Sequence, residues 1–226
     1  MRPDDAVIWD VDGTLVDTAE LHFRAWDRMT RELGLPFTRD DFNATFGWRN
    51  AEIIRKLFDP HSSDAKVAEL GTRKEEYYRA AARAEGIALL PGARPLLEGL
   101  HALGVGQAVG SSAPRANIDL ILELTQTRPF FDAIVSMEDT QRGKPDPQVF
   151  QTAADKLGVP HARCVVLEDA VVGVQAAKRG GMKAVAVRFV GHHPESALRE
   201  AGADRVVDSL EELTPEVLRD VLEGRG

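Results

Sequence analysis

Two aspartates, Asp10 and Asp12, stand at the end of an apolar run in the stretch VIWDVDGTLVDT, residues 7 to 18. Residues i and i+2 of a strand share a face, so both carboxylates can point into one crevice where the strand ends. Two anions this close repel each other unless something positive lies beside them. The pair could hold a hard cation such as Mg²⁺, could act as nucleophile and general acid/base, or could only cap the following loop.

Three further stretches bring polar side chains to similar positions. Ser111 and Ser112 end a second apolar run and offer hydroxyls and amides that suit phosphate oxygens. Lys144 lies in the sequence GKPDP, which predicts a rigid loop before a helix, and Glu168 and Asp169 form a second acid pair after another apolar run. Because the carboxyl ends of parallel strands meet at one edge of a sheet, we expect these groups to converge on one crevice.

Short apolar runs alternate with helical patterns along the chain, and they predict the strands and helices that position these groups. The runs are rich in valine and isoleucine and do not alternate with polar residues, which is typical of a parallel sheet covered on both faces. We therefore predict an α/β, doubly wound, Rossmann-like core. The predicted strands are Ala6–Val11, Val105–Ser111, Ala133–Ser136, Arg163–Glu168, Lys183–Arg188 and Arg205–Val207. The predicted helices between them are Pro95–Leu103, Asn117–Leu124, Pro147–Leu157, with Asp146 as its N-cap, and Ala170–Arg179.

Residues 17–88 interrupt this alternation with helical patterns and no convincing strand. These helices are predicted at Thr18–Leu33, Thr38–Thr45, Asn50–Phe58 and Ser63–Glu85. We predict an α/β core made of residues 1–16 and 89–226, with residues 17–88 inserted as a helical cap. Open α/β sheets bind ligands at the carboxyl ends of their strands, so a cap inserted after the first strand would lie over the site.

Composition limits the class of protein and its partners. The 226 residues are 43% hydrophobic and 28% charged, which fits a globular protein, and the formal net charge of −8 opposes binding to nucleic acid or anionic membranes. The single cysteine, Cys164, excludes an intrachain disulfide and fits a reducing compartment. The first residues lack a signal-peptide pattern, and no apolar stretch approaches the roughly 20 residues of a membrane helix. We expect a cytoplasmic protein without nucleic acid or membrane partners; a monomer fits, although the sequence does not set the oligomeric state.

The segments DVDGT, GSS, GKP and LED resemble, in order and spacing, the four motifs of the haloacid dehalogenase superfamily of phosphotransferases. The match covers essentially the whole chain. The helical insertion resembles the C1 cap of that superfamily, and its segments DTAELHFRAW, GWRN and TRKEEYY are most similar to β-phosphoglucomutase-like sugar phosphatases and mutases. The resemblance implies an enzyme that uses Mg²⁺ and acts on a small phosphorylated metabolite.

The resemblance also implies catalytic roles. Asp10 would attack phosphorus and form an aspartyl-phosphate, while Asp12 would protonate the leaving oxygen and then take a proton from the incoming water or hydroxyl. Lys144 and Ser111 would bind the phosphoryl oxygens. Ser112 could also contact the substrate or only fill space, and Ser111 could instead cap the helix that begins near residue 114.

The implied magnesium site uses oxygen ligands from both acid pairs. Asp10, the backbone carbonyl of Asp12 and Asp169 would hold the ion, and whether Glu168 is a direct ligand stays open. The superfamily often has an acid where Gln148 stands in this chain. This difference affects how neighbouring side chains support the ligands of the magnesium site, and it does not affect the catalytic chemistry.

The cap residues are the candidates for substrate recognition. His22 lies one helical turn after Thr18 and could couple cap closure to Asp12, or could be a packing residue. Arg49 and Lys74 match, at least approximately, residues of the mutase that grip the distal phosphate or hydroxyls. The mutase-like Gly-x-Ser-Arg becomes Gly47-Trp48-Arg49-Asn50, which removes the serine, moves the arginine and adds an aromatic side chain that could stack on a sugar or only pack. The candidate substrate-binding residues are Thr18, His22, Gly47, Trp48, Arg49, Lys74, Ser111, Ser112 and Lys144.

Three functions are compatible with these motifs. The altered GWRN segment favours a Mg²⁺-dependent phosphatase acting on a sugar phosphate or a similar small metabolite. The alternative is a β-phosphoglucomutase that interconverts β-glucose 1-phosphate and glucose 6-phosphate, in which a sugar hydroxyl rather than water meets the aspartyl-phosphate. A non-catalytic binding protein on the same fold would be expected to lose Asp10, Asp12, Lys144 or Asp169, and this sequence keeps all four.

Overall fold

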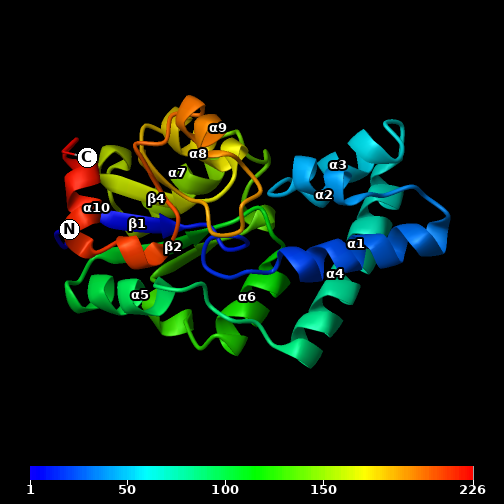
Figure 1. Ribbon diagram of the computed structural model, residues 1–226, viewed down its shortest axis with the longest axis horizontal. Helices are drawn as coiled ribbons and strands as arrows, with labels where there is room; N and C mark the ends of the chain where they lie inside the picture. The colour runs from blue at the N-terminus through cyan, green and yellow to red at the C-terminus, as the bar shows by residue number, and fades with distance from the viewer. Residues whose placement is uncertain (226) are drawn as a thin grey trace.

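A parallel β-sheet forms the centre of the computed structural model, which describes residues 1–225 (Figure 1). Over these residues the sheet has six strands in the order β3-β2-β1-β4-β5-β6, and every neighbouring pair is parallel. The predicted α/β, doubly wound fold is therefore confirmed. The strands are β1 Ala6–Trp9, β2 Gly106–Gly110, β3 Ala133–Val135, β4 Cys164–Glu168, β5 Lys183–Val187 and β6 Arg205–Val207.

Helices cover both faces of this sheet, and the side chains of β1 alternate between them. Val7 and Trp9 pack into the cluster that includes residues of α5, α6 and α10, whereas Ala6 and Ile8 pack into the cluster of α7, α8 and α9. A strand buried on both faces has no polar alternation, which is why the apolar runs predicted it. The helices are α5 Ala93–Ala102, α6 Arg115–Leu124, α7 Gln148–Leu157, α8 Val171–Arg179, α9 Glu195–Glu200 and α10 Pro215–Leu222. Short 3-10 turns occupy Arg128–Phe130, Met137–Asp139, His161–Arg163 and Leu210–Glu212.

Two predicted boundaries are wrong in ways that affect the site. β1 ends at Trp9 rather than residue 11, so Asp10 and Asp12 lie in the loop after the strand. The Asp10 N–H still donates to the Leu167 carbonyl of β4 at 3.0 Å, which continues the sheet pairing by one residue. Helix α7 begins at Gln148 rather than at the preceding proline, and the Asp146 carboxylate accepts from the Gln148 N–H at 3.0 Å as part of a turn.

The chain between β1 and α5 forms four helices that lie to one side of the sheet (Figure 1). They are α1 Ala19–Leu33, α2 Arg39–Thr45, α3 Asn50–Leu57 and α4 Asp64–Glu85, and we call them the helical insertion. Trp26, Phe42, Ile54 and Leu70 are buried in a core of their own. The insertion therefore has its own apolar interior.

The two crossings between the sheet and the helical insertion lie side by side. Val16 pairs with Leu89 in an isolated antiparallel bridge, and the Leu90 N–H donates to the Leu15 carbonyl at 3.0 Å. Gly92, just beyond the second crossing, has φ +84°, and a Cβ there would lie 2.3 Å from the Glu211 backbone nitrogen. Glycine is required at this position because both the backbone conformation and the close approach exclude a side chain.

Within residues 1–225, none of the helices combines the length and the apolar character that crossing a membrane requires.

Replacing Phe150 by alanine should lower the free energy of unfolding by about 3–5 kcal/mol, because its fully buried ring fills the space between α7 and the sheet. Chemical denaturation followed by circular dichroism measures this loss. As a control, Phe189→Ala removes a ring that is 45% exposed and should change stability by no more than about 0.5 kcal/mol. Equal losses in the two variants would contradict this assignment of the core.

Candidate active site

One buried lysine joins carboxylates from distant parts of the chain. The Lys144 ammonium, in the loop between β3 and α7, donates to Asp10 Oδ1 at 2.6 Å and to Glu168 Oε1 at 2.7 Å. Asp10 follows β1, Glu168 ends β4 and Asp169 follows it, so the parallel sheet brings these residues to its carboxyl edge. All four side chains are buried. The structure thus brings together side chains from three of the four motifs.

The charges of this cluster do not balance. Burial, together with Glu168 and Asp12, raises the pKa of Asp10 to about 7 despite the neighbouring Lys144. Burial and the neighbouring carboxylates raise the pKa of Asp169 well above its usual range. Burial alone would lower the pKa of Lys144, but Asp10 and Glu168 hold it above its ordinary value. One ammonium among three buried carboxylates leaves an excess of negative charge that a further cation would offset.

The donor set fits a magnesium ion. One oxygen from each of Asp10, Glu168 and Asp169 lies within 4.8 Å of the others, and Asp169 Oδ2 is buried without a hydrogen-bond partner. Mg²⁺ prefers such oxygen ligands. Gly13 leaves room for this arrangement, since it has φ +86° and a Cβ there would lie 2.2 Å from Asp169 Oδ2.

Asp12 belongs to a second hydrogen-bonded group, on the side of the helical insertion. The Thr18 hydroxyl donates to Asp12 Oδ1, and His22 Nε2 lies 3.2 Å from the same oxygen. His22 Nδ1 lies 2.7 Å from the Lys74 ammonium. An ammonium only donates, so Nδ1 accepts and Nε2 carries the hydrogen that is donated to Asp12. Burial alone would raise the pKa of Asp12, but His22, Thr18 and Lys74 together lower it.

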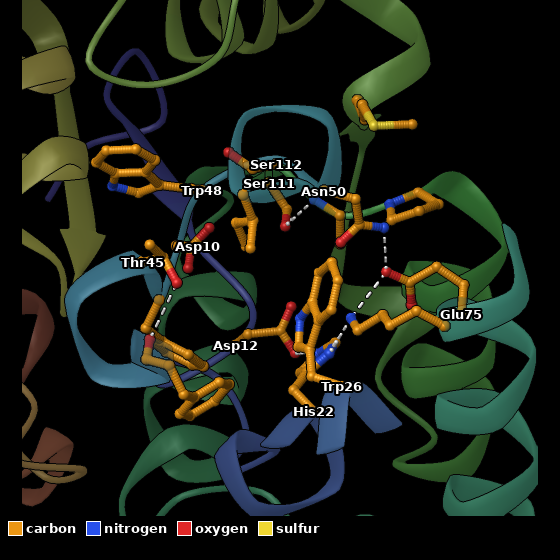
Figure 2. Close-up of a pocket in the computed structure, with 18 residues that line it drawn as sticks. Asp10, Asp12, His22, Trp26, Thr45, Trp48, Asn50, Glu75, Ser111 and Ser112 are labelled. Carbon is orange, nitrogen blue, oxygen red and sulfur yellow. Dashed lines mark hydrogen bonds and ion pairs between the residues drawn. The ribbon is translucent and has the colours of Figure 1, made fainter. Parts of the chain in front are cut away.

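The charge of Lys74 is balanced by Glu75, which the motif comparison missed. The ammonium donates to Glu75 Oε1 at 2.9 Å, and the same carboxylate accepts from the amides of Asn50 at 2.7 Å and Asn117 at 2.6 Å. Burial would raise the pKa of Glu75, but Lys74 and these donors lower it to about 2. Figure 2 shows the chain of contacts from Asp12 through His22 toward Glu75. Its sequence signal was the acid directly after Lys74.

His22 is also held by an aromatic neighbour. Its ring stacks on Tyr78 with centroids 4.0 Å apart and an angle of 7° between the planes. The sequence left open whether His22 contacts Asp12 or is a packing residue. In the structure it does both, since it packs against an aromatic ring and donates to Asp12.

The two serines line the cavity from the core side. The Ser111 hydroxyl accepts from the Ala113 N–H at 3.1 Å, so it stabilises the turn after β2. Helix α6 itself begins at Arg115 with Pro114 as its N-cap, and Ser111 does not cap it. Ser112 is half-buried beside it. Both side chains line the same cavity as Asp10.

The cavity, of about 60 Å³, lies between the carboxyl edge of the sheet and the helical insertion (Figure 2). Its apolar wall comes from the insertion and consists of Trp26, Phe42, Phe46, Trp48 and Ile53. Gly47 also lines it, with φ +84° and with space for a Cβ limited by Ala170. Among the residues that the structure describes, Lys74 is the only lysine or arginine in this lining.

Three predicted substrate-binding residues, Thr18, Arg49 and Lys144, do not line this cavity. Lys144 is buried and binds Asp10, which does line it. Thr18 is fully buried behind Asp12. Arg49 points its guanidinium to the backbone carbonyls of Thr140, Gln141 and Arg142 in the core, and it is absent from the cavity lining.

A buried acid and lysine cluster at the carboxyl edge of a parallel sheet, beneath inserted helices, is the architecture of an α/β enzyme site. The sequence profile of the haloacid dehalogenase-like hydrolases matches residues 7–187. The chain belongs to this family, and the predicted resemblance is confirmed.

Several individual proteins are also similar in sequence to this chain over most of its length. β-Phosphoglucomutase of Bacillus subtilis (strain 168) is 34% identical over 221 residues, covering 95% of this chain and 94% of that protein. Fructose-1-phosphate phosphatase YqaB of Escherichia coli (strain K12) is 33% identical over 196 residues, covering 81% and 96%. The chloroplastic protein SUPPRESSOR OF QUENCHING 1 of Arabidopsis thaliana is 33% identical over 97% of this chain, which spans only 21% of that protein's length. The relatives thus include both a mutase and a phosphatase.

A solved structure shows the same fold. The crystal structure of CbbY from Rhodobacter sphaeroides in complex with phosphate is similar with a TM-score of 0.84 and 30% sequence identity, covering 95% of this chain and 99% of that one.

Adding Mg²⁺ should stabilise the protein, by about 2.7 kcal/mol when the ion is at 100 times its dissociation constant. Asp169→Asn should lose most of this gain, because it removes one of the clustered carboxylates. Thermal unfolding with Mg²⁺ and with a chelator measures the effect. Asp119→Asn, which changes an exposed partner of Arg115, is the control. Equal stabilisation of the Asp169 variant and the unaltered protein would contradict this placement of the metal.

Proposed function

We propose that the protein is a Mg²⁺-dependent phosphatase that hydrolyses a small phosphorylated metabolite, a sugar phosphate by preference, through an aspartyl-phosphate. The observation that carries this proposal is the buried cluster in which Lys144 binds Asp10 at the floor of the cavity. Lysine holds the carboxylate in one orientation and opposes the rise of its pKa that burial causes, which favours the ionised, nucleophilic form. The family supports an enzyme of this chemistry.

The first step transfers the phosphoryl group to the protein. An oxygen of Asp10 attacks phosphorus, and the bond from phosphorus to the ester oxygen breaks. Asp12, whose pKa is lowered by its neighbours, must first take up a proton, and it then gives this proton to the departing oxygen. Thr18 and His22 both donate to Oδ1 of Asp12, so Oδ2 is the atom that exchanges the proton. Lys144 and Ser111 bind the phosphoryl oxygens as negative charge spreads over them.

The second step releases phosphate. The ionised Asp12 takes a proton from water, the water oxygen attacks phosphorus, and Asp10 leaves as a carboxylate. Asp10, Asp169 and the backbone carbonyl of Asp12 would hold Mg²⁺, which offsets the charge of the phosphate beside the carboxylates. Glu168 already accepts from Lys144 and from the Ala170 N–H at 2.6 Å, so we assign it to positioning Lys144.

The charges around the cavity favour the phosphatase over the mutase. A mutase that works through a bisphosphate must hold a second phosphate, and this requires a second cationic group. Within residues 1–225, Lys74 is the only lysine or arginine that lines the cavity, and Glu75 already balances its charge. Arg49 binds backbone carbonyls elsewhere. The similar identities of the mutase and the phosphatase to this chain do not separate the two functions.

The walls of the cavity indicate the substrate class. Trp26, Trp48 and Phe46 present apolar faces, while Asp12 and Ser112 present polar groups. Such a mixture suits a small sugar, whose C–H faces stack on aromatic rings and whose hydroxyls need hydrogen-bond partners.

The organisation around this chemistry is part of the proposal. We assign residues 17–88 to a cap that covers the site and residues 1–16 and 89–226 to the catalytic core. The net charge of −8 and the single buried thiol of Cys164 support a cytoplasmic protein with no nucleic acid or membrane partner.

A panel of phosphate esters with Mg²⁺ tests the function. The panel includes β-glucose 1-phosphate with a trace of glucose 1,6-bisphosphate, and both free phosphate and glucose 6-phosphate are measured. We expect free phosphate as the main product, and Asp10→Asn should lower its release by at least about 10⁴-fold because the nucleophile is lost. Glucose 6-phosphate with little free phosphate would contradict hydrolysis and favour the mutase. A fully active Asp10→Asn protein would contradict the mechanism in both cases.

Replacing His22 by phenylalanine should move the acid limb of the phosphate-release profile upward by about one pH unit, the equivalent of one charge-assisted hydrogen bond. Asp12 must be ionised to take a proton from water, and its lowered pKa keeps it ionised as the pH falls. Without the His22 donor this pKa rises, while phenylalanine keeps the stacking on Tyr78. The measurement is kcat against pH. As a control, His161→Phe removes a hydrogen bond to Asp155 and should leave the acid limb of the kcat profile at its original pH. An unshifted acid limb in His22→Phe would contradict this role of His22.

A further inference from the structure

We propose that Arg49 is a positioning residue that fastens the helical insertion to the loop carrying Lys144. We call the four hydrogen bonds of its guanidinium, to residues 140–142, the Arg49 clasp. The clasp links closure of the cavity to the placement of the amine that binds phosphate. This inference rests on the proposed function for its kinetic part, whereas its structural part stands without it.

The clasp consists of four acceptors around one guanidinium. Arg49 Nη1 donates to the carbonyls of Thr140 at 3.2 Å and Gln141 at 3.3 Å. Nη2 donates to the Arg142 carbonyl at 2.9 Å and to the Thr140 hydroxyl. The planar fork of arginine can satisfy several acceptors at fixed positions, whereas the ammonium of lysine is a point charge on a flexible stem.

The backbone on both sides is shaped for this contact. Arg49 is the N-cap of α3 and has extended backbone angles, φ −71° and ψ 146°, as its side chain reaches the core loop. On the core side, a Cβ at Gly143 would lie 3.0 Å from Arg49 Nε and 2.8 Å from Glu52 Oε1. The glycine before Lys144 therefore permits the close approach of the insertion.

The loop is held from two directions. Gln148 Oε1 accepts from the N–H groups of Gln141 at 2.9 Å and Arg142 at 3.1 Å, which ties the loop to α7. In the Arg49 clasp, the guanidinium donates to the carbonyls of the same two residues. Lys144 follows two residues later, so a shift of the loop moves its ammonium relative to Asp10.

The contact favours a complete clasp over a partial one. Arg49 Nε is buried without a hydrogen-bond partner, and burial lowers the pKa of the guanidinium although Glu52, Glu138 and Asp146 oppose this. An unpaired buried donor is destabilising. The four acceptors on the other two nitrogens offset that loss, so removing any of them should weaken the clasp.

The experiment combines a distance measurement with kinetics. Spin labels are placed at Ala65→Cys on α4 and Glu200→Cys on α9, two exposed positions, because the native Cys164 is buried and its pKa is raised to about 12. The unaltered protein should give one narrow distance distribution. Arg49→Ala should broaden it, and Thr140→Val should do so more weakly, since it removes one of the four acceptors.

The kinetic part separates positioning from substrate binding. Arg49→Ala should lower kcat by about 10- to 100-fold for every ester, including p-nitrophenyl phosphate, and change KM by less than about threefold, because a displaced Lys144 affects the transition state. Arg49→Lys should restore only part of this loss. The control is Arg55→Ala, which removes an arginine of the same helix that pairs with Asp64, and it should match the unaltered protein in both measurements.

Two results would overturn the proposal. The first is an unchanged distance distribution or an unchanged kcat in Arg49→Ala. The second is a rise in KM confined to esters with another anionic group, which would make Arg49 a substrate ligand. If no ester is hydrolysed by the unaltered protein, the proposed function fails, and the distance distributions alone decide whether the clasp exists.

Discussion

The structure of the site depends on one buried ammonium shared between two carboxylates. Lys144 reaches Asp10 and Glu168 from a loop that is far from both in the sequence, at 2.6 and 2.7 Å. This contact forms because β1 and β4 are neighbours in the parallel sheet and the loop after β3, two strands from β1, reaches their carboxyl ends. Removing Lys144 would leave Asp10 and Glu168 buried without their shared cation, which is a strongly destabilising change in a protein interior.

Two charge clusters face each other across the cavity and are balanced differently. The group on the helical insertion is locally paired, since Lys74 meets Glu75 and His22 meets Asp12. The group on the core retains more carboxylates than cations. Under the proposed function, a metal ion held by the core carboxylates would offset that excess before a phosphate ester binds, and the insertion would contribute shape and hydrogen bonds more than charge.

The sequence predicted those features that depend on local pattern. Within residues 1–225, valine-rich runs predicted the six strands because burial on both faces is visible residue by residue. The places of Asp10, Lys144 and Asp169 at the carboxyl ends of predicted parallel strands predicted their convergence. The exact end of β1 was missed, since the loop of Asp10 still pairs with β4 for one residue. The partners of Arg49 and Glu75 could not be predicted, because Arg49 meets residues about 90 positions away and this contact depends on how the insertion packs on the core.

The paired crossings at Val16 and Leu89 are one of several attachments between the helical insertion and the core. Leu21 and Tyr78 of the insertion also pack with Leu120 of α6, and the Arg49 guanidinium binds the loop of residues 140–142. Because the chain is continuous at the crossings, a movement of the insertion that widens the cavity would have to change these noncovalent contacts instead.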